Sequence, residues 1–277
     1  MWPVCACVGH LSSPVPVVGH PYMACMSHVP AAQLGRPDPP SRNEERVAPP
    51  APGGAALVFG DRLPLAERFT ALLTASGVTH GLIGPREVPR LWERHVLNCA
   101  VIHPAIPVGQ RVIDVGSGAG LPGLALAIAR PDLEIHCVEP MLRRTNWLSM
   151  AVADLRLTNV SVHRGRAEQF WGSLSAPVVT ARAVARLGEL ATWCLPLLLP
   201  GGSMLAIRGA SVADELTAER PVLRRLGAVD EVIESFGSGV VDPPTTVLRV
   251  VLGDRFAQRA GARKGKATSK RHGAGSG

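Results

Sequence analysis

The stretch at residues 111–123, RVIDVGSGAGLPG, is the feature that most constrains what this chain can fold into. Its first five residues form a β-branched run that suits a buried strand. Gly116, Gly118 and Gly120 follow at alternate positions, and helical spacing of apolar residues begins at Leu121. Glycines allow positive φ and close approach of a ligand to backbone N–H groups, and a helix N-terminus presents a positive dipole end. A strand, a glycine turn and a helix in this order predict a nucleotide-binding cradle.

An acidic residue follows at the distance that a ribose-binding site requires. Residues 133–138 form the next apolar strand, and Glu139 ends it about 20 residues after the glycine turn. A carboxylate at this place can accept hydrogen bonds from both ribose hydroxyls. We therefore expect an adenosine-like ligand.

Two cofactors compete for this cradle. Gly118, Gly120 and Gly123 match the G-x-G-x-x-G of dinucleotide-binding proteins, but the first glycine of that pattern should close the strand, and here Gly116 closes it. Asp114 completes D-x-G-x-G-x-G, which is similar to the pattern of class I S-adenosylmethionine-dependent methyltransferases. Its carboxylate would repel a pyrophosphate and attract a sulfonium or an ammonium group, directly or through water. We expect S-adenosylmethionine and keep NAD as the alternative.

The longer run at residues 113–140, IDVGSGAGLPGLALAIARPDLEIHCVEP, extends this motif. Together with LWERHVLN at 91–98, TARAV at 180–184 and PGGSMLAIR at 200–208, it resembles the bacterial small-subunit ribosomal RNA guanine-N7 methyltransferase G family, also called glucose-inhibited division protein B. The resemblance covers residues 57–252. One stretch departs from it: SGVTHGLIG stands at 76–84, where many members carry Trp-Asn and Asn-Leu-Thr.

The resemblance implies S-adenosylmethionine-dependent methylation of guanine N7 in 16S ribosomal RNA, with the small ribosomal subunit as partner. Arg182 matches the family's Ser-Arg-Ala position and is expected to face both the methyl donor and the target base, as the catalytic residue. Ala167 and Glu168 are expected to flank the adenine. The full expected cofactor set is Asp114, Gly116, Ser117, Gly118, Gly120, Leu121, Glu139, Ala167, Glu168 and Arg182.

The residues around Arg182 suit this reaction. Guanine N7 has an in-plane lone pair and no proton to lose, so methyl transfer needs alignment rather than a general base. Enzymes that methylate exocyclic amines carry Asn/Asp-Pro-Pro-aromatic after the fourth strand, and here TARA stands at 180–183. DPPT at 242–245 is interpreted as a turn. His95 is interpreted as a hydrogen-bonded packing residue rather than a chemical group.

Strands and helices are expected to alternate along most of the chain, which predicts a Rossmann-like α/β fold with a parallel sheet covered on both faces. The last two strands lack an intervening helix, so we expect a class I methyltransferase sheet of seven strands, mainly parallel, with an antiparallel last strand and N-terminal helices before it. Expected strands are 111–115, 133–138, 160–163, 178–181, 203–208, 229–235 and 246–252. Expected helices are 61–76, 85–102, one from 121 onward, 141–155, 167–171, 185–198 and 213–226.

Three regions are expected. Residues 1–56 hold eleven of the 25 prolines without a helical or alternating period, which indicates a disordered extension or a start site assigned too far upstream. Residues 57–253 form the methyltransferase domain, with N-terminal helices at 57–104 and the cofactor-binding core at 105–253. Residues 254–277 form a basic, disordered tail.

Charge points to an RNA partner. Seven basic and no acidic residues from Arg255 onward account for the net charge of +7, so the tail is either an anchor on RNA phosphates or a solubilising end. Further phosphate contacts are expected from Arg143, Arg144, Arg164, Arg166 and Arg208.

Other classes fit the sequence less well. No apolar run is long enough to cross a membrane, the N-terminus lacks the basic region of a secretory signal, and the cysteines and histidines match no zinc pattern. We expect a cytoplasmic protein without a metal, and favour a monomer. A class I methyltransferase of another substrate, an NAD-binding oxidoreductase and a non-catalytic RNA-binding protein remain as alternatives.

Overall fold

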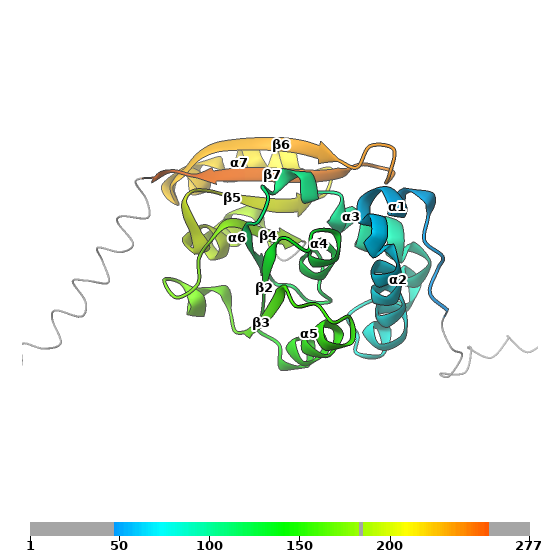
Figure 1. The fold of residues 1–277 in the computed structure, drawn as a ribbon. Coiled ribbons are helices and arrows are strands. Elements are labelled where there is room, and N and C mark those ends of the chain that lie inside the picture. The colour runs from blue at the N-terminus through cyan, green and yellow to red at the C-terminus, as the bar shows by residue number, and fades with distance from the viewer. Residues whose placement is uncertain (1–46, 183–184, 255–277) are drawn as a thin grey trace, which may run out of the picture. The chain divides into compact units, whose positions relative to one another are not determined.

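The computed structural model describes residues 47–182 and 185–254 of the 277-residue chain. These residues form a seven-stranded sheet in the order β3-β2-β1-β4-β5-β7-β6 (Figure 1). Its strands are β1 (Arg111–Val115), β2 (Glu134–Glu139), β3 (Val160–Arg164), β4 (Ala176–Arg182), β5 (Leu198–Arg208), β6 (Ala228–Phe236) and β7 (Thr245–Leu252). The first five are parallel, and β7 pairs antiparallel with both β5 and β6. The predicted sheet is confirmed.

The sheet separates two hydrophobic cores. Successive residues of a strand point to opposite faces, so Val112 belongs to one core and Ile113 to the other. The helices α4 (Gly123–Ala129) and α5 (Leu142–Asp154) cover the first face. The helices α6 (Leu187–Cys194) and α7 (Val212–Arg225) cover the second. Burial on both faces explains why the central strands are continuous apolar runs rather than alternating ones.

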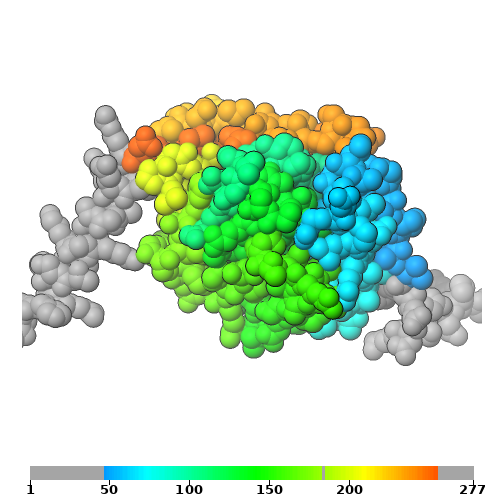
Figure 2. All heavy atoms as spheres, viewed as in Figure 1, coloured from blue at the N-terminus to red at the C-terminus, as the bar shows by residue number. Residues whose placement is uncertain are grey.

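The N-terminal segment packs on the first face beside α4, and in the space-filling view its blue surface adjoins the green core (Figure 2). It begins with α1 (Gly53–Phe59) and α2 (Leu63–Leu72), joined by a 3₁₀ turn at Gly60–Arg62, and a π-helical turn, Leu73–Gly77, extends α2. It continues with a 3₁₀ helix at Pro85–Arg90, a π-helical turn at Trp92–Val96 and the short α3 (Leu97–Ala100).

Two expectations for this segment need correction. The helix predicted over 85–102 is divided into 3₁₀, π and α turns, because Pro89 lacks the N–H that a regular α-helix needs at that place. Helix α1 begins at Gly53, inside the range 1–56 that was expected to be disordered, and the carbonyl of Pro49 accepts a hydrogen bond from Trp92 Nε1 at 3.0 Å. Residues 1–46 and the tail from 255 onward lie outside the described residues.

The remaining elements begin and end within a few residues of their predicted bounds, except that β5 starts at Leu198 rather than 203 and α6 ends at Cys194, followed by a 3₁₀ turn, Leu195–Leu197. The expected helix at 167–171 is a 3₁₀ helix, Ala167–Phe170. None of the helices within 47–182 and 185–254 is long and apolar enough to cross a membrane.

Candidate active site

The glycine turn after β1 has the backbone that the sequence predicts. Gly116, Gly118 and Gly120 have φ values of 73°, 53° and 79°, a region that L-residues with side chains rarely adopt. The N–H of Gly116 donates to the Val138 carbonyl at 2.8 Å, which ties the turn to β2. A Cβ added at Gly118 would meet only the Gly116 carbonyl oxygen, at 3.8 Å, and would otherwise project into open space. The turn therefore leaves a cradle that side chains would fill.

Asp114 lies beneath this cradle and is fully buried. Its carboxylate accepts hydrogen bonds from the Gly123 N–H at 3.0 Å and from Thr180 Oγ1 at 3.3 Å, and Ser117 Oγ donates to its backbone carbonyl at 2.9 Å. Burial raises the pKa of this carboxyl to about 6, against the opposing effect of the hydrogen bonds. Asp114 thus joins β1 to α4 and β4, and contact with the ammonium group of a ligand stays a prediction.

Glu139 lies at the end of β2 and faces the cradle. Its Oε2 accepts the N–H of Gly118 and its Oε1 accepts the N–H of Met141, each at 3.0 Å, and Arg144 Nη1 lies 3.8 Å from Oε2. Met141, which sequence reasoning did not single out, is exposed beside this carboxylate. The hydrogen bond from Gly118 brings the two ends of the predicted cofactor site together.

The other predicted cofactor residues border the same edge of the sheet. Ser117 and Leu121 are buried in the turn before α4. Ala167 is buried, and Glu168 is half-buried, at the start of the 3₁₀ helix that follows β3. The Gly165 N–H donates to the Glu139 carbonyl at 3.1 Å, which holds this helix beside the end of β2.

These residues fit S-adenosylmethionine. The open side of Gly118 leaves room for the methionine portion, and each oxygen of Glu139 accepts one backbone N–H and keeps a second lone pair for a diol. Among the residues the structure describes, no group of three or more His, Cys, Asp or Glu side chains could hold a metal ion.

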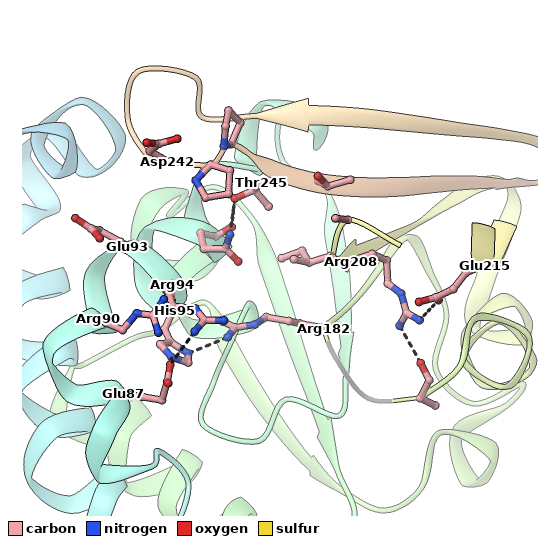
Figure 3. A pocket seen from close by; sticks show the side chains of 18 residues that line it. Glu87, Arg90, Glu93, Arg94, His95, Arg182, Arg208, Glu215, Asp242 and Thr245 are labelled. Carbon is pink, nitrogen blue, oxygen red and sulfur yellow. Dashed lines mark hydrogen bonds and ion pairs between the residues drawn. The ribbon is translucent and has the colours of Figure 1, made fainter. Parts of the chain in front are cut away.

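A pocket of about 870 Å³ opens at the carboxyl ends of β4 and β5 (Figure 3), and β4 is a neighbour of β1, the strand that leads into the cradle. The β1–β4 register places Ala181 opposite Val115, so Arg182 lies level with Gly116. Many of the residues that line the pocket are charged. The lining consists of Glu87, Arg90, Glu93, Arg94, His95, Asn98, Arg182, Ala185, Ile207, Arg208, Gly209, Ala210, Glu215, Asp242, Pro243, Pro244, Thr245 and Thr246. The lining combines four arginines with four carboxylates, so it suits a substrate that both accepts and donates hydrogen bonds, with the arginines available to anionic groups.

Arg182 reaches from the end of β4 toward the N-terminal segment (Figure 3). Its Nη1 donates to Cys99 Sγ at 3.0 Å and its Nη2 donates to His95 Nδ1 at 2.8 Å. On the far side of the imidazole, His95 Nε2 lies 2.9 Å from Glu87 Oε2. Burial and the neighbouring guanidinium lower the pKa of His95, and burial raises the pKa of the Cys99 thiol. The expected packing role of His95 is thus too narrow, because its ring lines the pocket and holds Arg182.

The turn between β6 and β7 forms another wall of the pocket. Residues 242–244 lie in the connection between the strands, as interpreted, but Thr245 already begins β7, and Asp242 and Thr245 also line the pocket. Asn98 Nδ2 donates to Thr245 Oγ1 at 2.8 Å, and Thr245 Oγ1 donates to the Asn98 carbonyl at 3.0 Å. This reciprocal contact fastens the turn to α3. The sequence carries no signal for it, since the two residues are 147 positions apart.

The five predicted phosphate contacts do not come together. Arg208 lines the pocket, where it pairs with Glu215 and donates to the Ala185 carbonyl at 2.8 Å. The other four, Arg143, Arg144, Arg164 and Arg166, are not in its lining. Sequence reasoning missed Arg90 and Arg94, which are exposed on the pocket wall.

The reversed β7 strand, the glycine cradle with its paired Glu139 and the adjoining pocket define a class I methyltransferase, an enzyme whose methyl donor is S-adenosylmethionine. The model of the family described as rRNA small subunit methyltransferase G matches residues 62–241. This chain belongs to that family.

Three relatives named ribosomal RNA small subunit methyltransferase G illustrate the similarity. The protein of Streptomyces avermitilis is 52% identical over 236 residues, which cover 82% of this chain and 99% of the relative. The protein of Streptomyces coelicolor is 52% identical over 238 residues, covering 83% and 100%. The protein of Pseudarthrobacter chlorophenolicus is 54% identical over 198 residues, covering 72% and 92%.

Proposed function

We propose that this protein transfers a methyl group from S-adenosylmethionine to N7 of a guanine in 16S ribosomal RNA. The relatives carry the name of a ribosomal RNA small subunit methyltransferase, which supports small-subunit RNA as the substrate class. The observation that carries the proposal is the arginine-lined pocket, which opens beside the cofactor cradle with Arg182 at the junction. Ribosomes assemble in the bacterial cytoplasm, so the proposed activity belongs there, and we propose that a monomer performs it.

Arg182 has hydrogen-bonding capacity to spare. A guanidinium carries five N–H donors, and within the described residues Arg182 uses one on Cys99 and one on His95. The remaining donors can hold the O6 edge of a guanine, a common partner of arginine. N7 gains positive character during methyl transfer, so a guanidinium on N7 itself would oppose the reaction, whereas one on O6 orients the base.

The proposed reaction needs no general base, and two of the four carboxylates that line the pocket already have partners. The carboxylate of Glu87 is engaged by His95 and that of Glu215 by Arg208. When bound, S-adenosylmethionine supplies an electrophilic methyl group, and the lone pair of N7 attacks it without loss of a proton. The protein then has to hold the base in line, and such alignment supplies roughly 7–11 kcal/mol of a barrier.

The size of the pocket and the exposed arginines on its wall suit an unstacked nucleotide. Arg90 and Arg94 are exposed on its wall, where they can contact the phosphates on either side of an inserted base. Proteins read RNA sequence mainly in single-stranded loops, because the bases of a duplex are not accessible. We therefore propose that the target guanine enters the pocket from a loop and that the basic residues beyond 254 add sequence-independent attraction.

The test is methyl transfer from tritium-labelled S-adenosylmethionine to small-subunit RNA and to assembled small subunits purified from cells that lack the protein. We expect label at guanine N7, located by mapping the modified base. The variant Arg182→Ala should bind S-adenosylmethionine with nearly unchanged affinity and lose most of the transfer. Arg68→Ala is the matched control, because Arg68 is exposed and pairs with Asp154 on α5. Label on protein or on another base atom would contradict the proposal.

A further inference from the structure

His95 connects two charged groups that come from distant parts of the chain. Arg182 ends β4, Glu87 lies in the 3₁₀ helix at Pro85–Arg90, and the imidazole of His95 lies between them (Figure 3). The two contacts measure 2.8 Å, from Arg182 Nη2 to His95 Nδ1, and 2.9 Å, from His95 Nε2 to Glu87 Oε2. The side chain of His95 is only 13% exposed. Water therefore has little access to compete for these contacts.

The partners determine the tautomer of the ring. A guanidinium has no acceptor, so Arg182 must donate and Nδ1 of His95 must carry a lone pair. Glu87 accepts only, so Nε2 must carry the hydrogen. This arrangement needs a neutral imidazole with its proton on Nε2. A carboxylate that orients a histidine, which in turn orients a working group, is a recurrent arrangement in enzyme sites.

We propose that His95 and Glu87 are positioning residues, which hold the guanidinium of Arg182 in the plane that lets its free N–H groups face the pocket. This inference rests on the proposed function, because it assigns Arg182 the task of orienting the target base. Cys99 supports the other terminal nitrogen of Arg182 at 3.0 Å, so the guanidinium is held at two corners. A long side chain held in this way loses little freedom when the base arrives.

The arrangement makes transfer sensitive to pH although the chemistry moves no proton. A protonated His95 has no lone pair on Nδ1 and would present a second cation to Arg182. Besides Glu87 and Arg182, the charged groups of the pocket are Arg90, Glu93, Arg94, Arg208, Glu215 and Asp242, and the Cys99 thiol lies on the far side of Arg182. Burial is the main cause that keeps the pKa of His95 below its ordinary value. The rate should therefore be constant near neutral pH and fall as pH drops through the pKa of His95.

The experiment compares two replacements that each keep one contact. In His95→Asn the amide oxygen takes the place of Nδ1 and keeps an acceptor for Arg182, whereas in His95→Gln the amide reaches Glu87 and leaves Arg182 Nη2 without its acceptor. His95→Ala removes both contacts. His80→Asn is the control, because His80 is exposed, lies outside the pocket lining and hydrogen-bonds the Ser76 carbonyl through Nδ1. Rates with small-subunit RNA and affinities for S-adenosylmethionine are measured for each variant.

We expect kcat to fall about 10- to 100-fold in His95→Ala and His95→Gln, the loss typical of a misplaced orienting group, and much less in His95→Asn. Affinity for S-adenosylmethionine should stay within about twofold, since His95 does not border the cradle. His95→Asn should also lose the acid fall in rate, which a purely structural role would not predict. If His95→Ala fails to fold, the Asn and Gln variants decide the question.

A double-variant cycle tests whether His95 acts through Arg182. Added to Arg182→Ala, His95→Ala should cost less than about twofold in kcat, because coupled residues are not additive. Full additivity, or equal rates for His95→Gln and the wild type, would overturn the inference. A wild-type protein that does not methylate guanine N7 would instead overturn the proposed function, so the two failures are distinguishable.

Discussion

Gly123 is a residue on which the packing of α4 against the sheet depends, and the substitution Gly123→Ala tests this dependence. A Cβ at this position would lie 2.7 Å from Asp114 Oδ2 and 2.9 Å from Cys137 Sγ. Asp114 and Cys137 are register partners on β1 and β2, and both are fully buried. Neither side chain can turn toward solvent. Relief of the contacts therefore requires α4 to move away from the sheet.

The expected cost follows from two effects. Overpacking of a well-packed interior costs about 1–3 kcal/mol. A displaced α4 also weakens the 3.0 Å hydrogen bond from the Gly123 N–H to the Asp114 carboxylate, and a hydrogen bond to a charged group is worth about 1.5–3 kcal/mol. The gain of up to about 1 kcal/mol from alanine in a helix offsets part of this. We expect a net loss of about 3 kcal/mol, which for a domain of this size lowers Tm by about 6–12 °C.

The assay is thermal and urea denaturation of the purified protein, with S-adenosylmethionine affinity measured by calorimetry. Gly53→Ala is the matched control, because a Cβ at this helix start meets no atom within 4 Å and its stability should not fall. In a Cys137→Ala background the penalty of Gly123→Ala should shrink, since one of the two close contacts is gone. A Gly123→Ala protein that melts with the wild type would refute the reasoning.

Three further outcomes are expected. Asp114 has a folded-state pKa of about 6 against an ordinary value of 3.8, so its contribution to stability is fully present below about pH 4 and is lost as pH rises through about 6. This loss amounts to about 3 kcal/mol of unfolding free energy. In Asp114→Asn the fall in unfolding free energy across this pH window should disappear. Glu139→Gln should weaken S-adenosylmethionine binding about tenfold or more in calorimetry, because the charged acceptor of the predicted ribose contact is lost. Asn98→Ala should cost about 1–2 kcal/mol in thermal denaturation and raise KM for RNA, because the buried Thr245 loses its donor partner.

Much of the fold could be predicted from the sequence, because local signals agree with the tertiary structure. The run at 111–123 reads as strand, turn and helix, and the structure places the three positive-φ glycines in that turn. The missing helix between the last two expected strands predicted the reversed β7, since only antiparallel neighbours can be joined by a short turn. Helix α1 escaped prediction because it opens with Gly53 and Gly54, which disfavour helix, and is stabilised by packing instead.

In the candidate site, the sequence predicted the geometry around the glycine turn and named Arg182 and Arg208, but not how the pocket is assembled around them. The cradle and Glu139 are separated by one strand–helix unit, so their proximity follows from spacing in the sequence. The pocket instead joins the 3₁₀ and π turns around His95 with the ends of β4 and β5 and the β6–β7 turn. No periodicity predicts that Arg182 and His95, 87 residues apart, share a hydrogen bond. Nor does the sequence pattern predict that the Asp114 carboxylate accepts a hydrogen bond from the Gly123 N–H at the start of α4.

The reversed direction of β7 has a consequence for how specificity can diversify. Its first residues pair with the last residues of β5, at Thr246 and Arg208, so the β6–β7 turn overhangs the pocket without any crossover helix. The turn is anchored through Thr245 to Asn98 and through the buried side chain of Val241 to the first core. Replacement of the pocket-lining residues 242–244 by those of another methyltransferase, with Val241 kept, would reshape the entrance for a different nucleotide while every strand stays in register.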